Sequence, residues 1–472
     1  MDPQMHYGLL SLLPACLAIV LAFATRNTVF SLAVACVVGV SIMGQGPMGF
    51  PTLLKTSLGT TDFSWILLLE LFIGTVIAFF QRTGAIRNFT AWVEARALSR
   101  VRVQLVGWFM GMFVFFSDYF SPLFVGSTLR GLTDRYRVSR EKLAYIADST
   151  SAPVSVLVPI TGWAVFISGL LIGMGPIDTA GEAMQAFVYA VPFNLYAWLS
   201  VLVVGLVIVG VVPLFGPLKR AEARAQNEGK VFRDGADPLL GEELTDLQPF
   251  EGVRTHLFLN FVLPVLIVIG VAVSTFVVMG SAKTMEAFLA AAVVLGVIMR
   301  LQGIPLNDIM KTATAGMKGV MPAILILALA YSLNQLSKEM GTAGYIVEIS
   351  RDWLSPTLLP AITFLLAALI AFATGSSWGT FAIMMPISVP VAFVFTGDTL
   401  TPLVYATIAA VAGGGVFGDH CSPLSDTTVL ASTGSACDHM DHVRTQIPYA
   451  LAVALVSLAI YLLVGVTLVD IG

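Results

Sequence analysis

Charged side chains are scarce in this sequence. Asp, Glu, Lys and Arg make up only 11% of its 472 residues, whereas hydrophobic residues make up 57%. A soluble domain carries about 25% charged residues, and a soluble chain of this length could not bury so much apolar surface. These proportions exclude a cytosolic enzyme, a nucleic-acid-binding protein and a disordered chain. They predict a polytopic membrane protein.

Net charge and cysteine content are also low. The formal net charge of −4 is too small to indicate a polyanionic partner. Cys16, Cys36, Cys421 and Cys437 form no CxxC pair, and three of them lie in apolar runs. We therefore expect packing residues rather than a disulfide framework. No basic segment precedes the first apolar stretch, so we expect no cleavable signal peptide.

Long apolar runs predict an all-α protein with about ten full transmembrane helices. A helix that spans a bilayer needs about 20 mostly apolar residues. The candidates are residues 7–24, 28–45, 63–80, 143–173, 186–215, 257–279, 319–337, 402–430 and 446–468, with a shorter run at 285–299.

Two further apolar segments are interrupted by polar residues. Residues 103–129 are broken at Ser117–Pro122 and are too short for two spans, and residues 357–396 are broken at Thr374–Thr380. Irregular backbone at membrane depth survives only when it is buried in protein or faces a cavity. We interpret both segments as helical hairpins that enter the membrane and return to the same side.

The distribution of positive charge predicts the orientation of the chain. When the hydrophilic stretches 81–102 and 130–142 are placed in the cytoplasm, 21 of the 25 Lys and Arg residues fall on that side. Cytoplasmic loops carry such an excess. We expect a multi-pass protein of the cell (inner) membrane with both termini outside.

A charged stretch, residues 219–255, divides the chain almost in half. Segments of mixed charge and low hydrophobicity rarely fold alone, so we interpret it as a solvated cytoplasmic linker. It would join a first repeat, residues 1–218, to a second repeat, residues 256–472. The first helix of the second repeat, residues 257–279, would enter from the opposite side to the first helix of the chain.

Each half contains a hairpin followed by an interrupted helix. The interruptions read Asp148–Ser155 within residues 143–173 and Asp419–Ser425 within residues 402–430. An inverted-topology repeat with paired broken helices is the architecture of secondary transporters, and the breaks mark a binding site near the membrane midplane. The sequence therefore predicts such a transporter.

The residue types in the breaks suit a small hard cation. Unwound backbone offers carbonyl oxygens, and Ser149, Thr150 and Ser151 add hydroxyl oxygens beside Asp148. Oxygen-only ligand sets suit hard cations. Proline cannot donate a backbone hydrogen bond, so Pro153 helps to keep the first interruption open.

Several acids lie at apparent membrane depth: Glu70, Asp118, Asp148, Asp419 and Asp426. A carboxylate at the centre of a membrane helix costs about 2.5–3.5 kcal/mol on insertion scales, so such acids are functional candidates. Burial favours the protonated group and bound sodium favours the carboxylate. One acid can therefore exchange a proton for a cation. The alternative is a structural role, in which these acids cap helix ends or bond to hydroxyls.

Two other features have an ordinary explanation. The stretch Asp438–His442 has the composition of a metal cluster, but a polar helix turn explains it better because ligand spacing alone is weak evidence. A pH-sensing role for its histidines is open. Trp378 lies in the break of the second hairpin, where packing is the simpler role than walling a substrate cavity.

Three segments near the C-terminus carry a resemblance. Gly418–Thr428, Ser432–Gly434 and Cys437–Gln446 resemble the signature of the NhaC family of sodium/proton antiporters, and Thr374–Thr380 and Gly8–Pro14 are also similar to that family. The resemblance implies a sodium/proton exchanger, a homodimer of inverted repeats with scaffold and mobile parts. It implies no cofactor beyond the transported Na+ and H+. Relatives with the same motif are associated with organic-acid exchange and amino-acid uptake, so it fixes the sodium-linked machinery better than the solute.

The resemblance places ion ligands around the two breaks and the second hairpin. With the residues of the first break, the candidate ligands for ions or substrate are Asp148, Ser149, Thr150, Ser151, Ser376, Ser377, Asp419, Ser422, Asp426 and Thr427. Sodium would bind through Asp148 and Asp419. The candidates for proton coupling are Asp118, Asp148, Asp419 and Glu70.

Four functions compete at this stage. Sodium/proton antiport is the first. Transport of a small organic solute, an amino acid or a carboxylate driven by sodium or protons, is the second. No arginine lies in the predicted membrane core, which favours a cation over an anion. An intramembrane aspartyl protease using Asp148 and Asp419 would leave the repeats without purpose. A passive channel would lack strictly sodium-dependent proton movement.

Overall fold

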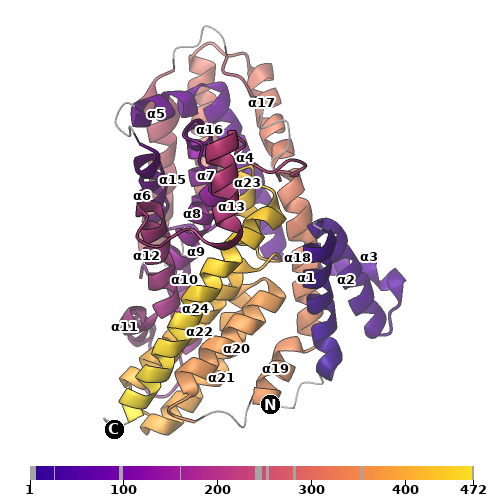
Figure 1. Cartoon of the computed structure of the whole chain (residues 1–472), viewed down its shortest axis with the longest axis vertical. Coiled ribbons are helices and arrows are strands. Elements are labelled where there is room, and N and C mark those ends of the chain that lie inside the picture. Colours follow the sequence, from indigo (N-terminus) through magenta and orange to yellow (C-terminus); the bar gives the residue numbers. More distant parts are fainter. Residues whose placement is uncertain are drawn as a thin grey trace.

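The computed structural model describes residues 7–25, 27–94, 99–159, 161–239, 247–250, 255–279, 283–350 and 355–469. Within these ranges the regular structure is helical throughout and no strand occurs. Parts of the predicted linker, residues 240–246 and 251–254, lie outside them, as do Arg26, Arg96 and Arg351 of the charges used to orient the chain. The expected all-α polytopic fold is confirmed (Figure 1).

The helices of the first half begin and end as follows. They are η1 (Gly8–Leu12), α1 (Leu13–Thr25), α2 (Thr28–Ile42), η2 (Pro47–Gly49), α3 (Phe50–Leu58), α4 (Thr61–Arg82), α5 (Ala85–Glu94), α6 (Arg100–Phe113), α7 (Phe120–Arg135), α8 (Arg140–Ser149), α9 (Ala152–Ser155), α10 (Gly162–Leu171), α11 (Ala180–Ala190), η3 (Val191–Phe193), α12 (Leu195–Val209) and α13 (Gly216–Glu228).

The second half follows the charged stretch. Its helices are η4 (Phe258–Val262), α15 (Leu263–Met279), α16 (Thr284–Leu301), α17 (Leu306–Gly319), α18 (Met321–Glu339), α19 (Thr342–Ser350), α20 (Leu359–Thr374), α21 (Ser377–Thr396), α22 (Pro402–Cys421), α23 (Asp426–Gly434) and α24 (His439–Val469).

Several of the described helices could cross a membrane. Six of them are long and apolar enough to cross a bilayer, and up to nine spans result if three bent helix pairs count as one span each. The short run at 285–299 belongs to α16, which is one of the six. The expected total of ten spans and the positions of the termini stay predictions.

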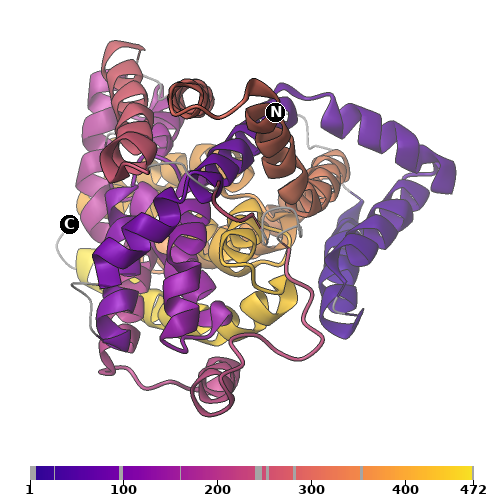
Figure 2. The same cartoon turned by 90° about the horizontal axis from the view of Figure 1, so that it is seen from above.

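The described helices bury two large apolar cores. The first joins α2, α4, α16 and α18 with the start of α7 and with α23. The second joins α10, α11 and α12 with α20, α21, α22 and α24. The helices α1–α3 project from one side of the molecule in two perpendicular views (Figures 1 and 2). Because the start of α7 lies in the first core whereas α20 and α21 lie in the second, the two hairpins pack in different cores.

Each segment predicted to form a hairpin is a pair of packed helices, and its return to the same side of the membrane stays a prediction. The first is α6 and α7, and the second is α20 and α21. Helix α7 packs against α8 of its own half and α23 of the other half, whereas α21 packs against α22 of its own half and α10 of the other. Each hairpin thus packs on one helix of its own half and one of the other half, as expected for an inverted repeat. The division into two repeats itself stays a prediction.

The two helix interruptions lie close to their expected positions. Helix α22 ends at Cys421, the backbone of Ser422 is extended, and α23 begins at Asp426. The first interruption is longer than expected, because the chain after α8 forms the single turn α9 and then a loop before α10 begins at Gly162. Residues 143–173 are therefore three helical pieces rather than one helix with a single break.

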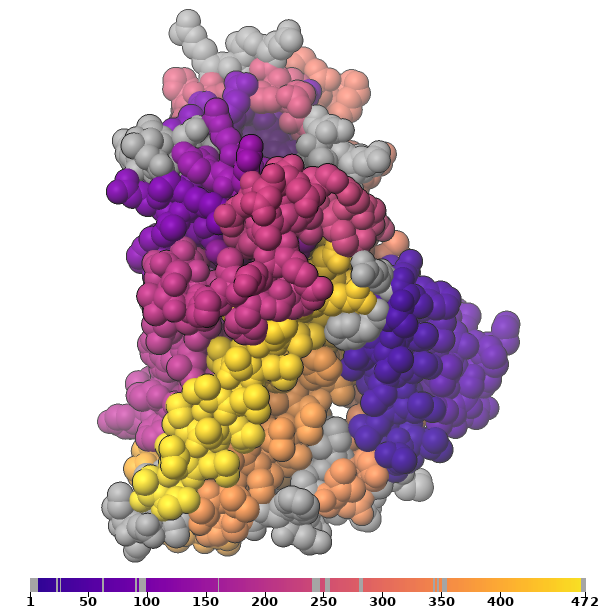
Figure 3. Space-filling view, viewed as in Figure 1, coloured from indigo at the N-terminus to yellow at the C-terminus, as the bar shows by residue number. Residues whose placement is uncertain are grey.

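The structure corrects the expectation of a solvated linker. Helix α13 buries Leu218, Ala221 and Ala225, which are spaced to lie on one face of a helix. The carboxylate of its buried Glu222 is paired with Arg100 and Lys142. The charges that suggested a solvated segment are thus used in contacts with α6 and α8, and α13 covers the start of α24 (Figure 3).

A sharp bend of the chain after α2 was not predicted. Residues 28–45 were expected to form one span. Helix α2 ends at Ile42, and η2 and α3 follow at an angle of 114°. Gly44 and Gly46 adopt left-handed backbone conformations in this turn, which glycine reaches without steric cost.

Close packing of α20 on α22 provides a test of the fold. A Cβ added to Gly418 would overlap the backbone of Ala371 and Phe372. We expect Gly418→Ala to destabilise the protein by about 1–3 kcal/mol, the usual cost of overpacking. Thermal unfolding of the purified protein measures this.

The control is Gly270→Ala in α15, where an added Cβ meets no atom within 4 Å. This substitution should leave stability unchanged or raise it slightly, since alanine favours helix over glycine. Equal unfolding temperatures for the two variants would contradict the close packing of α20 and α22.

Candidate ion-binding site

The tip of the second hairpin touches the interruption between α22 and α23. Gly375 ends α20 with a φ of 68°, and a Cβ at this position would lie 2.5 Å from the carbonyl oxygen of Leu424. Ser376 caps the N-terminus of α21 by accepting a hydrogen bond from the backbone N–H of Gly379. The hydroxyl of Ser422 donates to the carbonyl of Phe372 at 2.8 Å. These contacts fix the hairpin tip against the interruption.

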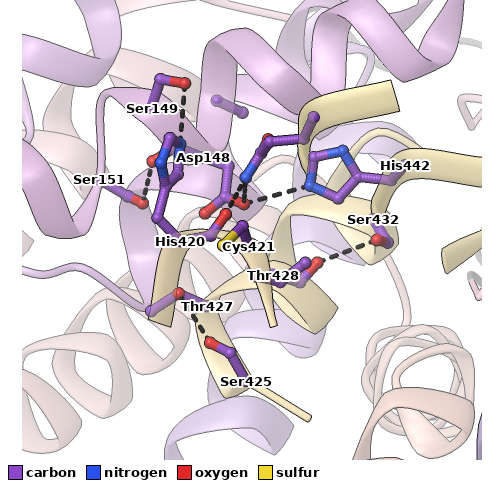
Figure 4. Close-up of polar contacts among 12 residues, drawn as sticks. Asp148, Ser149, Ser151, His420, Cys421, Ser425, Thr427, Thr428, Ser432 and His442 are labelled. Carbon is purple, nitrogen blue, oxygen red and sulfur yellow. Dashed lines mark hydrogen bonds and ion pairs between the residues drawn. The ribbon is translucent and has the colours of Figure 1, made fainter. Parts of the chain in front are cut away.

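Asp419 is the carboxylate at this junction. Its side chain is 1% exposed, and its Oδ2 accepts a hydrogen bond from the hydroxyl of Ser377 in the hairpin at 3.0 Å. Its Oδ1 accepts from the hydroxyl of Ser425 in the interruption, and Ser425 lies 3.1 Å from the hydroxyl of Thr427 (Figure 4). Three hydroxyls and a carboxylate from three elements thus form one cluster of hard oxygen atoms.

Asp148 forms a second buried cluster with donors from α24. Its Oδ2 accepts from the amide of Gln446 at 2.7 Å and lies 3.2 Å from Nε2 of His442. Figure 4 shows the carboxylate of Asp148 pointing toward this imidazole. The other oxygen, Oδ1, has no hydrogen-bond partner among the described residues. Asp148 is therefore held by nitrogen donors, unlike Asp419.

His420 links the two clusters. Its Nε2 lies 2.9 Å from the hydroxyl of Ser149 in α8, and its Nδ1 lies 2.8 Å from the hydroxyl of Tyr196 in α12. His420 directly follows Asp419, and its carbonyl accepts a hydrogen bond from Gln446. The two interruptions are thus joined by side-chain contacts across the halves of the chain.

The remaining hydroxyls predicted as ligands bond to backbone carbonyls. Thr150 donates to the carbonyl of Ile146 at 2.8 Å and Ser151 to that of Asp148 at 2.6 Å. Ser155 donates to the carbonyl of Phe115 near the tip of the first hairpin at 2.9 Å. All three lie at the first interruption as expected. The roles of Thr150 and Ser151 as ligands stay predictions, and Ser155 was not among the predicted ligands.

Asp426 and Asp118 lie together on a large cavity next to these clusters. Asp426 is half-buried, and its Oδ2 accepts from the hydroxyl of Tyr119 at 2.9 Å. Both acids line a cavity of about 700 Å³, which Ser376 and Trp378 of the second hairpin also line. Sequence reasoning had favoured a packing role for Trp378, whereas the structure places it on the cavity wall.

Glu70 lies in the middle of α4 and is fully buried. Neither of its carboxylate oxygens has a hydrogen-bond partner within the described residues. A buried acid without a hydrogen bond is costly. Its role in proton coupling stays a prediction.

The structure gives Asp438–His442 three different roles. Asp438 pairs with Arg233 of the charged stretch, and His439 lies between Ser432 and the carbonyl of Pro423. His442 contacts Asp148 instead. No three His, Cys, Asp or Glu side chains in the described ranges come close enough to hold a metal ion. The residues therefore act separately rather than as one metal site.

Sequence reasoning missed the partners of Asp148. His442 was considered only as part of a polar turn and for a pH-sensing role, and Gln446 was not singled out for a site. Tyr196, which contacts His420, was not singled out either. The available signal was that Gln446 ends the segment resembling the NhaC signature, in a helix with few polar residues. Nothing in the sequence showed that this helix meets α8.

The contacts of Gln446 provide a second test. Its amide nitrogen donates to both Asp148 and the carbonyl of His420, and its side chain is 0% exposed. We expect Gln446→Ala to destabilise the protein by about 1–3 kcal/mol, because buried acceptors lose their donor. The same change at the exposed Gln185 is the control and should leave thermal unfolding unchanged. Equal stability of both variants would argue against this network.

Comparisons of the sequence with family models and with known proteins point to the same family. The family model described as the Na+/H+ antiporter family matches residues 173–466. An "uncharacterized protein" of Haemophilus influenzae is 32% identical over 97% of this chain and 91% of its own length. The Na+/H+ antiporter NhaC of Alkalihalophilus pseudofirmus is 28% identical, over 34% of this chain and 33% of that protein.

Among solved structures, the YdaH transporter of Alcanivorax borkumensis is 13% identical, and the match covers 88% of each chain with a TM-score of 0.38. The family assignment rests on the sequence matches, which include the interruption at Asp419 and the whole of the second hairpin. The NhaC resemblance seen in the sequence is thereby confirmed. The chain is a multi-pass membrane protein that belongs to the Na+/H+ antiporter family.

Proposed function

We propose that this protein exchanges Na+ for H+ across the cell (inner) membrane by alternating access, and that Asp419 carries either ion in turn. The supporting observation is the set of oxygen atoms around this acid. Its carboxylate is buried and receives hydrogen bonds from Ser377 and Ser425. Membership of the Na+/H+ antiporter family agrees with this chemistry.

Competition for one carboxylate couples the two ions. Burial disfavours the bare carboxylate, so the acid is stable either protonated or beside a cation. A hydroxyl that donates to the carboxylate can rotate and present a lone pair to sodium. Ser377 and Ser425 can therefore serve both states without moving their backbone, and one ion must leave before the other binds.

Asp148 is the weaker candidate for direct sodium binding. Its Oδ2 faces nitrogen atoms of His442 and Gln446. An N–H group has no lone pair for a cation, so of the two carboxylate oxygens only Oδ1, which has no hydrogen-bond partner among the described residues, is open to sodium. We infer that Asp148 anchors the first interruption and that Asp419 holds the ion.

Exchange at this site requires that it open to each side in turn. The hairpin that supplies Ser377 and the interruption that supplies Ser425 belong to different helices, so their separation would dismantle the ligand set. Binding of Na+ or H+ would draw both elements together. In this proposal both termini lie outside the cell. The protein is a homodimer in which one part of each subunit moves against a scaffold.

Loss of the carboxylate at Asp419 tests the proposal. Asp419→Asn keeps the shape of the side chain but cannot alternate between protonated and charged states. We expect it to abolish sodium-dependent proton movement in proteoliposomes carrying a pH-sensitive dye. The exposed Asp178 is the matched control, and Asp178→Asn should retain exchange. Normal exchange by a folded Asp419→Asn variant would exclude this site.

Removal of one hydroxyl tests the ligand set. Ser377→Ala deletes a single oxygen from the hairpin side of the cluster. We expect the sodium concentration for half-maximal exchange to rise about tenfold, which corresponds to about 1.4 kcal/mol. The same change at Ser41, an exposed residue whose hydroxyl bonds within α2, should have no effect. Unchanged sodium dependence for Ser377→Ala would show that this hydroxyl does not bind the ion.

One observation favours a second function, sodium- or proton-coupled transport of a small organic solute. The cavity beside the Asp419 cluster has a volume of about 700 Å³. Ligand pockets typically have volumes of about 300–1,000 Å³, whereas one water molecule takes up about 30 Å³ of liquid. The cavity is larger than sodium exchange requires.

A further inference from the structure

The cavity of about 700 Å³ beside the Asp419 cluster has acidic side chains in its interior and charges of both signs at its rim. Its inner wall carries Asp118, which is 5% exposed, and Asp426. Oδ2 of Asp118 has no hydrogen-bond partner in the described part of the chain. Asp426 retains one face toward the cavity. The interior is therefore an acidic environment with an unused buried acceptor.

The rim is formed by the ends of three helices. Thr60 caps the start of α4, Thr284 begins α16, and Lys338 lies in the last turn of α18. Glu286 and Lys338 are exposed there, so water solvates their charges. Lys283, which directly precedes α16 at this rim, also lines the cavity and is half-buried. The lining therefore carries two lysines at the rim and two aspartates in the interior, and the aspartates act most directly on a solute inside the cavity.

Aromatic side chains surround the same interior. The rings of Trp163 and Trp378 are 5.3 Å apart, and those of Phe166 and Trp378 are 4.9 Å apart. On the other side, Trp65 packs edge-on against Tyr119 at 5.7 Å. All five line the cavity. Aromatic faces attract ammonium groups, most strongly where water is excluded.

We propose that this cavity binds a small organic cation that carries an ammonium group on a short aliphatic chain. Asp118 and Asp426 would hold the ammonium group, and the rings of Trp163 and Trp378 would contact both this group and the chain. An anion is disfavoured because two aspartates would repel it. Binding of such a cation does not require the proposed sodium/proton exchange, although its transport would rest on that machinery.

The cavity reaches the hairpin tip beside the proposed ion site. Gly375, Ser376 and Leu424 line it, and Gly375 and Leu424 are the two residues at which the hairpin tip meets the interruption. An organic cation would thus lie beside the elements that hold sodium. Its ammonium charge and that of sodium would repel each other, so each should weaken binding of the other.

The test compares two probes of similar size and opposite charge, n-butylammonium and butyrate, on the purified full chain. Binding is followed by tryptophan fluorescence and by thermal unfolding, since a ligand that binds only the folded state stabilises it. We expect n-butylammonium to quench fluorescence saturably and to raise the unfolding temperature. Butyrate at equal ionic strength should do neither.

Variants assign the binding to this cavity. We expect Asp426→Asn to abolish binding of n-butylammonium and Trp378→Leu to weaken it about tenfold, the scale of a desolvated cation–π contact. Trp378→Phe keeps an aromatic face and should restore most of the affinity. Trp198→Leu, at a half-exposed tryptophan of α12, and Asp178→Asn are the matched controls and should bind normally.

Several outcomes would overturn the proposal: equal binding of butyrate, normal binding by folded Asp426→Asn, or the same weakening for Trp198→Leu as for Trp378→Leu. The proposed function fails separately. Sodium-dependent proton exchange without n-butylammonium binding would reject the cavity alone, whereas n-butylammonium binding without such exchange would reject the exchange mechanism alone.

Discussion

The interior of a bilayer offers no water to a backbone group, so every interruption of a helix must be satisfied within the protein. The contacts at both interruptions meet this constraint. Ser155 donates to the carbonyl of Phe115 in the first hairpin, and Ser422 donates to that of Phe372 in the second. Each hairpin is thus attached to the broken helix of its own half.

The two interruptions use different chemistry despite their similar sequences. Asp419 receives hydroxyl groups, whereas Asp148 faces nitrogen atoms of His442 and Gln446. A hydroxyl presents a lone pair to a cation by rotating its O–H bond alone, whereas Gln446 would have to turn over its whole amide group to present an oxygen. Asp419 can therefore accept either a proton or a cation among its hydroxyl neighbours, whereas Asp148 is held in place by its nitrogen donors. The fixed acid gives the first broken helix a stable position against α24.

Much of this arrangement could be predicted from the sequence, because polar residues at membrane depth have few explanations. The breaks at Ser117–Pro122 and Thr374–Thr380 indicated both hairpins, and Asp148 and Asp419 indicated both interruptions. The packing of α13 could not be predicted, since its partners in α6, α8 and α24 are distant in the sequence. The partners of Asp148 were equally inaccessible, because His442 lies 294 residues away along the chain.

The amide of Gln446 contacts both halves of the chain at once. A single nitrogen atom donates to Asp148 in α8 and to the carbonyl of His420 in α22. The two broken helices are thereby tied to one rotamer of one side chain. If α24 shifted along its axis by a fraction of a helical turn, both hydrogen bonds of Gln446 would be strained together. A movement of α24 would therefore affect both interruptions at once.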